Sequence, residues 1–124
     1  MLQTQRLLLI APSSMTRTPA FDRAAALARA MQLPLHIVAF DYLQALAIAG
    51  LFAPEQINRA REGYLDTHRH WLAEQAEVMR QRGVEVTSEV VWVHHPYEEI
   101  LHFVNEMSLA LIIKDAEQVP ALKR

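Results

Sequence analysis

The sequence predicts an α/β domain built on a doubly wound open parallel sheet with helices on both faces, and two observations support this fold class. Short apolar runs recur along the chain and alternate with longer stretches in which apolar residues fall at helical spacing. The connections between these runs are long enough for right-handed crossovers between parallel strands. With 124 residues, of which 52% are apolar, and no internal repeat, the chain is expected to form one domain over residues 1–124.

The first half of the chain is predicted to form a strand, a helix and a second strand. Residues 7–11 are a continuous apolar run, typical of a strand covered on both faces, and Pro12 ends it. A helix should follow, with Thr18 as its N-cap and Pro19 as its first residue. Its inner face is expected to consist of Phe21, Ala24, Ala25, Ala28 and Met31. The β-branched, apolar run LHIVAF, residues 35–40, is the second strand.

A long amphipathic helix and a third strand are predicted next. The helix should run from about Pro54 to Arg82, with Gly83 in the position that follows a helix C-terminus. Its inner stripe is expected to consist of Ile57, Ala60, Tyr64, Trp71, Leu72, Ala76 and Met79. Residues 84–95 alternate at first and are fully apolar over 90–93, which predicts a strand with one exposed and one buried end.

The last predicted elements are a short helix and a fourth strand. Pro96 should begin the helix, with His95 as a weak N-cap and with Glu98 and Glu99 at the positive end of the helix dipole. Its packing face is expected to consist of Ile100, Leu101, Val104 and Met107. The run LALIIK, residues 109–114, is the fourth strand.

Composition excludes several classes of function. A formal charge of −2, with acids and bases interspersed, gives no basic surface for nucleic acid. The absence of cysteine excludes disulfides, thiolate metal sites and cysteine nucleophiles. The longest uncharged stretch, residues 42–54, is too short and too broken by Gly50 and Pro54 to span a bilayer, and the N-terminus lacks the pattern of a secretory signal. We therefore expect a cytoplasmic protein.

Candidate ligand-binding residues follow from the fold class. Doubly wound sheets bind ligands outside the carboxyl ends of their strands, where the winding reverses. The residues expected at that edge are Pro12, Ser13, Phe40, Asp41 and Lys114. A solvent-exposed lysine at the end of a strand is the simpler interpretation of Lys114. The nearby loop SSMTRTP could hold an anion at a helix N-terminus, although ordinary capping by Thr18 is favoured.

Histidines raise the question of a metal site. His94, His95 and Glu98, with His102 close behind, gather at one strand-to-helix junction and are the candidate ligands. Because His94 and His95 would point to different sides of a continuing strand, a capped helix is the favoured interpretation and no metal or cofactor is expected. His68 falls on the inner stripe of the long helix and is interpreted as a packing histidine.

No catalytic constellation is recognisable. The chain has no nucleophile elbow and no pair of carboxylates whose spacing places both in the crevice. Ser13 could approach His94 or His95 at adjacent strand ends, but chance proximity is the better explanation. We therefore predict that the protein is not an enzyme and assign no catalytic residue.

Two segments of the sequence resemble the universal stress protein family. FDRAAALARAMQLPLHIVAF is similar to the first helix and second strand of that family. HWLAEQAEVMRQRGVEVTSEVVWVHHPYEEIL resembles the long helix, third strand and following helix in the first repeat of tandem-domain, UspE-like members. The resemblance implies a Rossmann-like or flavodoxin-like α/β/α sandwich with strand order 3-2-1-4, in which the family's usual fifth strand is missing here.

The resemblance also implies that nucleotide binding is improbable. Members that bind ATP have an aspartate at the end of the first strand, where this chain has Ala11, and a glycine motif after the fourth strand, where it has Lys114 and Asp115. Glycine lets backbone amides approach phosphate, and side chains at those positions hinder this approach. Lys114 could instead occupy the space that a phosphate takes in the binding members, pairing with Asp115 or Asp41.

Partner binding is the function that these features favour. Without a fifth strand, the apolar outer edge of residues 109–114 would be unpaired, which predicts a homodimer or another partner that covers it. The expected function is a non-catalytic stress-response domain with a degenerate nucleotide site that acts through self-association or partner binding. The alternatives are a module that binds a small molecule such as ATP, AMP or an apolar ligand, a histidine-based metal protein or enzyme, and a shortened half of a tandem protein.

Overall fold

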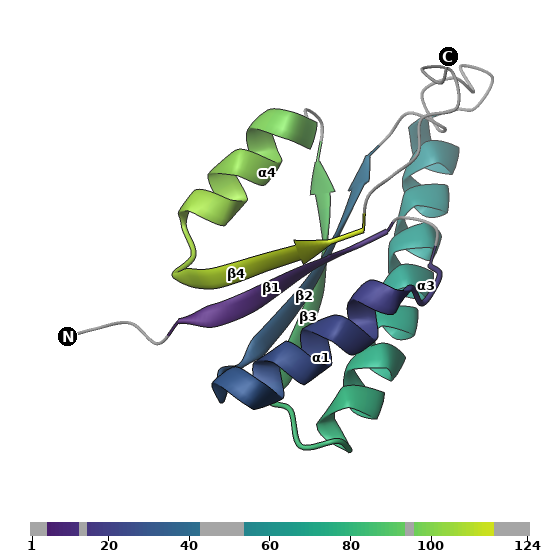
Figure 1. Cartoon of the computed structure of the whole chain (residues 1–124). Coiled ribbons are helices and arrows are strands. Elements are labelled where there is room, and N and C mark those ends of the chain that lie inside the picture. Colours follow the sequence, from purple (N-terminus) through teal and green to yellow (C-terminus); the bar gives the residue numbers. More distant parts are fainter. Residues whose placement is uncertain (1–4, 13–14, 43–53, 94–95, 116–124) are drawn as a thin grey trace, which may run out of the picture.

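Four parallel strands form the centre of the fold. The computed structural model describes residues 5–12, 15–42, 54–93 and 96–115 (Figure 1). Strands β1 (Arg6–Ala11), β2 (Leu35–Tyr42), β3 (Val86–Val93) and β4 (Leu109–Lys114) pair in the order β3-β2-β1-β4. The predicted fold class and strand order are confirmed.

Helices cover both faces of this sheet. Helices α1 (Pro19–Met31) and α3 (Pro54–Arg80) lie on one face, and α4 (Pro96–Asn105) lies on the other (Figure 1). The chain winds from β1 through β2 to β3 on the first side, and α4 then carries it back across the sheet to β4, beside β1. The winding therefore reverses between β1 and β4.

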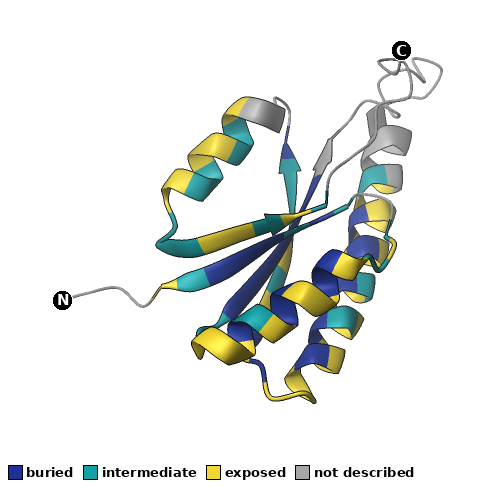
Figure 2. Ribbon diagram, viewed as in Figure 1, coloured by how far each residue is buried: buried dark blue, intermediate teal, exposed yellow. Residues whose placement is uncertain are grey.

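Each face of the sheet has its own apolar core, because successive side chains of a strand point to opposite faces. The larger core lies beneath α1 and α3, and it includes Leu7, Leu9, Phe21, Ile37, Leu72 and Met79. The smaller core lies beneath α4, and it includes Leu8, Val38, Phe40 and Val93, with Phe103 and Val104 packed against it. Burial of one such side chain contributes about 1.5–3 kcal/mol to stability, so the α1 and α3 side supplies most of the stabilisation (Figure 2).

Helix α1 follows the prediction except at its last residue. Phe21, Ala24, Ala25 and Ala28 are buried, and the ring of Phe21 meets that of Trp71 edge to face at 5.7 Å. Met31 was expected on this inner face but is 41% exposed. The helix ends at Met31 and the chain turns through Gln32, in the left-handed region at φ 57°. The next residue, Leu33, packs against the core in place of Met31.

Helix α3 buries a stripe that differs in part from the expected one. Trp71, Leu72, Ala76 and Met79 lie toward the core as predicted, and so does His68, which is fully buried. Tyr64 was wrongly placed on this stripe: it is 38% exposed, and its neighbour Leu65 is buried instead. Leu65, His68, Leu72 and Ala76 follow one another at spacings of three or four residues, so they form one buried stripe along α3. The side chains of Ile57 and Ala60 lie outside the described residues.

The end of α3 confirms the role predicted for Gly83. The amide of Gly83 donates to the carbonyl of Arg80 at 3.0 Å, and the amide of Val84 donates to that of Met79 at 3.3 Å. This pair of bonds is the Schellman arrangement, which requires a left-handed residue, and Gly83 has φ +88°. The helix itself ends at Arg80, two residues before the predicted position.

The two edge strands are less buried than their sequences suggest. In β3 the run 90–93 was expected to be fully buried, but Val90, Val91 and Trp92 are half-buried and only Val93 is buried. In β4, Leu111 is 41% and Ile112 is 48% exposed. Each edge strand has a neighbour on one side only among the described residues, so part of each apolar run faces solvent.

Helix α4 packs on the sheet through a slightly different set of residues than predicted. Ile100, Val104 and Met107 contact the smaller core as expected, together with Phe103. Leu101 was assigned to this face but is 63% exposed. The packed residues Ile100, Phe103 and Val104 follow helical spacing, and Leu101 lies to the side of the stripe that they form. No helix among the described residues is long and apolar enough to cross a membrane.

Candidate functional site

The predicted ligand residues at the strand ends are only partly brought together. Pro12 follows β1 and is half-buried, and Lys114 ends β4 and is exposed. Phe40 is buried under α4, where its ring meets that of Phe103 edge to face at 5.4 Å, so it belongs to the smaller core. Asp41 pairs in register with Trp92 at the end of β2 and β3, but its side chain lies outside the described residues, as does Ser13.

Thr18 and Asp115 connect the N-terminus of α1 to the end of β4. Thr18 has the extended backbone of an N-cap, but its side chain makes no capping bond, so the predicted capping role is wrong for the hydroxyl. The hydroxyl instead donates to the carboxylate of Asp115. Because the first amides of a helix attract anions, this carboxylate lies close to a position where a bound anion would otherwise be favoured.

Two nearby cations are engaged with the protein itself. The ammonium of Lys114 donates to the backbone carbonyl of Asp115 at 3.3 Å. The guanidinium of Arg17 donates to Gln75 on α3 at 2.8 Å and pairs with Asp22 on α1, and it lies 5.6 Å from the ring centroid of Phe21. Arg17 therefore holds the start of α1 against α3, which leaves little of it for an external anion.

The pKa of Asp22 is perturbed by its neighbours. The hydrogen bond and charge of Arg17 hold the pKa of this carboxyl below its ordinary value of 3.8, and Arg82, at 3.2 Å, acts in the same direction. Asp22 thus joins the loop before α1 to the turn after α3.

The predicted metal ligands do not form a described site. His94 and His95 lie outside the described residues, and Glu98 is exposed in the first turn of α4. His102 pairs with Glu106 at 3.2 Å, one helical turn further along the chain. No group of three potential metal-ligating side chains occurs among residues that the structure describes.

Met15 lines a shallow cleft. This cleft has a volume of about 490 Å³ and lies between the loop and α3, with Thr67, His70 and Trp71 on its helical wall. Met15 adopts φ 55°, a left-handed conformation that is unusual for methionine.

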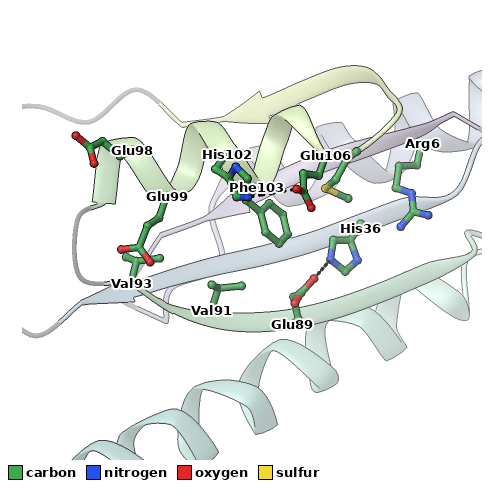
Figure 3. Close-up of a pocket in the computed structure, with 11 residues that line it drawn as sticks. Arg6, His36, Glu89, Val91, Val93, Glu98, Glu99, His102, Phe103 and Glu106 are labelled. Carbon is green, nitrogen blue, oxygen red and sulfur yellow. Dashed lines mark hydrogen bonds and ion pairs between the residues drawn. The ribbon is translucent and has the colours of Figure 1, made fainter.

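A deeper cavity, here called the α4–β3 groove, lies on the opposite face of the sheet (Figure 3). Its volume is about 680 Å³, within the range of sites for small molecules. Apolar side chains form part of its lining: Val91, Val93, Phe103 and Met107. The other lining residues are Arg6, His36, Glu89, Glu98, Glu99, His102 and Glu106.

His36 occupies the floor of the α4–β3 groove and is 7% exposed. Its Nε2 lies 2.7 Å from a carboxylate oxygen of Glu89 (Figure 3). Its Nδ1 lies 2.6 Å from the hydroxyl of Thr87. An ionised carboxylate only accepts, so Nε2–H donates to Glu89, and Nδ1 of the neutral ring accepts from Thr87. The ring also stacks on Phe103 at 6.5 Å, and it is thus held in place on two sides.

Sequence reasoning did not identify the α4–β3 groove. His36 lies inside an apolar strand and Glu89 inside another, so each resembles an isolated polar residue. The register of the sheet aligns Val38 with Glu89 and His36 with Thr87, which places His36 and Glu89 on the same face. Strand parity, combined with a polar residue in each of two neighbouring strands, is the signal that could have revealed the pair.

Comparison with known proteins identifies a family for most of the chain. A model of the Universal stress protein family matches residues 4–124. Universal stress protein E of Salmonella typhi is 26% identical over 116 residues, which cover 92% of this chain and 36% of that protein. The homologue from Photorhabdus laumondii is also 26% identical, over 89% of this chain and 35% of its own length. The chain thus spans about a third of the length of these relatives.

Solved structures support the fold. A universal stress protein family member from Burkholderia pseudomallei superposes with a TM-score of 0.68 at 21% identity, covering 89% of this chain and 80% of that one. UspA of Lactobacillus plantarum gives a TM-score of 0.69 at 11% identity, covering 98% and 85%. A structure from Archaeoglobus fulgidus, in complex with dAMP, gives 0.52 at 18% identity, covering 87% and 78%.

Proposed function

The chain belongs to the universal stress protein family, and from this premise we propose that it is a non-catalytic stress-response domain that acts through association at the outer edge of β4 and does not bind nucleotide in the family's usual manner. The observation that carries the proposal is the end of β4. There Lys114 and Asp115 stand where phosphate-binding glycines would be needed, and Asp115 bonds to Thr18 at the N-terminus of α1.

Electrostatics argue against a phosphate at this position. A phosphate bound at the start of α1 would meet the carboxylate of Asp115, and like charges this close repel each other. The side chains of Lys114 and Asp115 also hinder the close approach of backbone amides that glycine permits. Ala11, at the end of β1, is 5% exposed and carries no polar group for a ribose or base.

The edge of β4 supports the association part of the proposal. Among the described residues β4 pairs with β1 alone, so its other edge offers unpaired backbone groups. Leu111 and Ile112 point to opposite faces of the sheet and are 41% and 48% exposed. A second copy that pairs along this edge would satisfy the backbone groups and cover both side chains, as in a two-fold symmetric dimer.

Multi-angle light scattering after size exclusion tests this association. We expect the unmodified chain to elute as a dimer and the Ile112→Lys variant as a monomer, because a lysine at the edge of a strand opposes pairing. Val78→Lys is the matched control, since Val78 is a similarly exposed apolar residue on α3, at 39%. It should remain dimeric.

Two outcomes would contradict the proposed interface. One is a monomeric unmodified chain at high concentration, and the other is equal dimerisation of the Ile112→Lys and Val78→Lys variants. Circular dichroism of each variant confirms that the fold is intact before the masses are compared.

A nucleotide-binding domain is the second candidate, and one observation favours it. A structural neighbour from Archaeoglobus fulgidus was solved in complex with dAMP. If this chain retained such a site, AMP or ATP should raise its melting temperature, and Lys114→Glu should abolish that shift by adding a negative charge at the end of β4. A cytoplasmic location and a role in the stress response complete the proposal, and they are supported by the family assignment.

A further inference from the structure

We propose that the α4–β3 groove is a binding site for a small organic cation with an apolar body, such as an aromatic or alkyl amine. The groove lies on the α4 face of the sheet, between α4 and β3, and none of the described residues that line it belongs to β4. It is also separate from the strand ends at which Pro12 and Lys114 lie. The inference therefore does not depend on the proposed association or on the fate of the nucleotide site.

The shape and lining of the groove suit a molecule with an apolar body. Val91 and Val93 come from β3, and Phe103 and Met107 come from the segment that begins with α4, so apolar walls face each other across the space (Figure 3). The aromatic ring of Phe103 is held between His36 and Phe40 by ring contacts at 6.5 and 5.4 Å. This support makes the apolar wall rigid, and a rigid wall lowers the entropic cost of binding.

The charge of the lining determines the sign of the ligand. Four carboxylates and one guanidinium line the groove, which gives a formal charge of −3 when its two imidazoles are neutral. The whole chain carries only −2, so negative charge is concentrated here. Such a concentration beside an apolar wall favours a cation and repels an anion.

Helix capping accounts for only half of these carboxylates. Glu98 and Glu99 lie in the first turn of α4, where the helix dipole favours acids. Glu106 lies just beyond the other end of α4, where the dipole favours cations, and Glu89 lies in a strand, where glutamate is uncommon. Glu106 pairs with His102 of α4 and Glu89 pairs with His36 of β2, so neither charge is required by the helix dipole, and both residues line the groove.

The His36–Glu89 contact fixes the position of one carboxylate. Glu89 is 45% exposed at its side chain, so it can still meet a ligand while Nε2 of His36 holds it at 2.7 Å. His36 is in turn held by Thr87 and by stacking on Phe103. A carboxylate that is oriented before binding loses less conformational entropy when it pairs with an ammonium group.

An NMR titration with three probes of nearly equal size tests the proposal. Phenylbutylamine is the cationic probe, phenylbutanol the neutral one and phenylbutyrate the anionic one. We expect the amine to shift the amide signals of β3 and α4 in the millimolar range or below. The alcohol should bind about tenfold more weakly, a difference of the size that one favourable charge contact produces, and the acid should not bind.

Charge-neutral variants connect the binding to the named carboxylates. Glu89→Gln combined with Glu106→Gln keeps the size and an acceptor oxygen at both positions, and it should weaken binding of the amine about tenfold while binding of the alcohol stays the same. The matched control, Glu62→Gln with Glu77→Gln, removes two exposed glutamates from α3 and should change neither.

Three outcomes would overturn the proposal. The first is the absence of shifts at β3 and α4 at saturating amine, and the second is equal affinity for the amine and the alcohol. The third is equal weakening by the groove variant and the α3 control, which would assign the effect to net charge. Each is read from the same spectra, which also report whether the variants are folded.

Discussion

The hydroxyl of Thr18 donates to the carboxylate of Asp115, and so the first turn of α1 is tied to the residue that follows β4, 97 positions later in the chain. Thr18 stands at the position of an N-cap but does not use its side chain as one. A carboxylate from the end of a distant strand lies at this helix N-terminus instead, which stabilises the helix dipole from outside the helix. The same contact places negative charge where a phosphate would have to bind.

Removal of the charge of Asp115 should therefore destabilise the domain. Asp115→Asn weakens a hydrogen bond to a charged acceptor and removes a favourable helix-dipole interaction, with an expected loss of about 1 kcal/mol in the free energy of unfolding. Asp66→Asn is the control, because Asp66 forms a surface pair with Arg69 at 2.8 Å within α3 and should cost no more than about 0.5 kcal/mol. Urea denaturation measures both losses. Equal losses would mean that the Thr18–Asp115 contact stabilises the fold no more than a surface ion pair does.

Two glycines should respond to alanine in opposite directions. Gly83 has φ +88°, and a Cβ there would meet nothing within 4 Å, so Gly83→Ala incurs only backbone strain of about 1–2 kcal/mol. Gly63 lies inside α3, also with open space around its Cβ, and Gly63→Ala should stabilise the domain by about 0.5–1 kcal/mol. Thermal denaturation checks both, and stabilisation by Gly83→Ala would show that the Schellman turn is not as described.

Adjacent residues of α3 test which side of the helix is buried. Leu65 is 5% exposed, and Leu65→Ala should cost about 2–5 kcal/mol by leaving a cavity. Tyr64 is 38% exposed and touches the ring of His68 edge to face at 6.0 Å, so Tyr64→Ala should cost about 1 kcal/mol or less. Chemical denaturation measures the free energy of unfolding of both variants. A larger loss for Tyr64→Ala would mean that Tyr64, and not Leu65, lies on the buried side of α3.

Acid should weaken the contact between α1 and α3 through Asp22. Its pKa is lower in the folded chain than its ordinary value of 3.8, mainly because of the hydrogen bond and charge of Arg17. A lowered pKa stabilises the folded state above the ordinary pKa, and this contribution disappears as the pH falls through the lowered value. The stability advantage of the unmodified chain over Asp22→Asn should thus be largest near neutral pH and vanish in strong acid. Because the group is exposed, the advantage should be small and should decrease with salt. Denaturation of both proteins across pH tests this, and an advantage that grew on acidification would be inconsistent with it.

The order of elements could be read from the sequence because it depends on local patterns. The boundaries of β4, the start of each helix at Pro19, Pro54 and Pro96, and the left-handed turn at Gly83 were all predicted. Each is set by neighbours in the chain, such as a proline that opens a helix or a glycine that ends one. The parallel strand order was expected from the family resemblance and from the rules for crossover connections.

What the sequence did not reveal depends on contacts between distant residues. Met31 is exposed because α1 ends there, whereas Tyr64 and Leu101 each lie one position away from the residue that packs, Leu65 or Ile100. The bond from Thr18 to Asp115 and the His36–Glu89 pair arise only once strands are aligned in register. Sequence periodicity locates a buried stripe to within one or two positions, whereas a polar pair between distant strands requires the fold itself.

Native mass spectrometry of the purified chain, with and without Mg-ATP, is the most direct test of the central claim, because it reports association and retained ligand in one experiment. A dimer whose mass does not change when Mg-ATP is added is the predicted result. It would mean that the edge of β4 is covered by a second copy and that the end of the strand no longer holds phosphate. A monomer that carries one nucleotide would contradict both parts of the account.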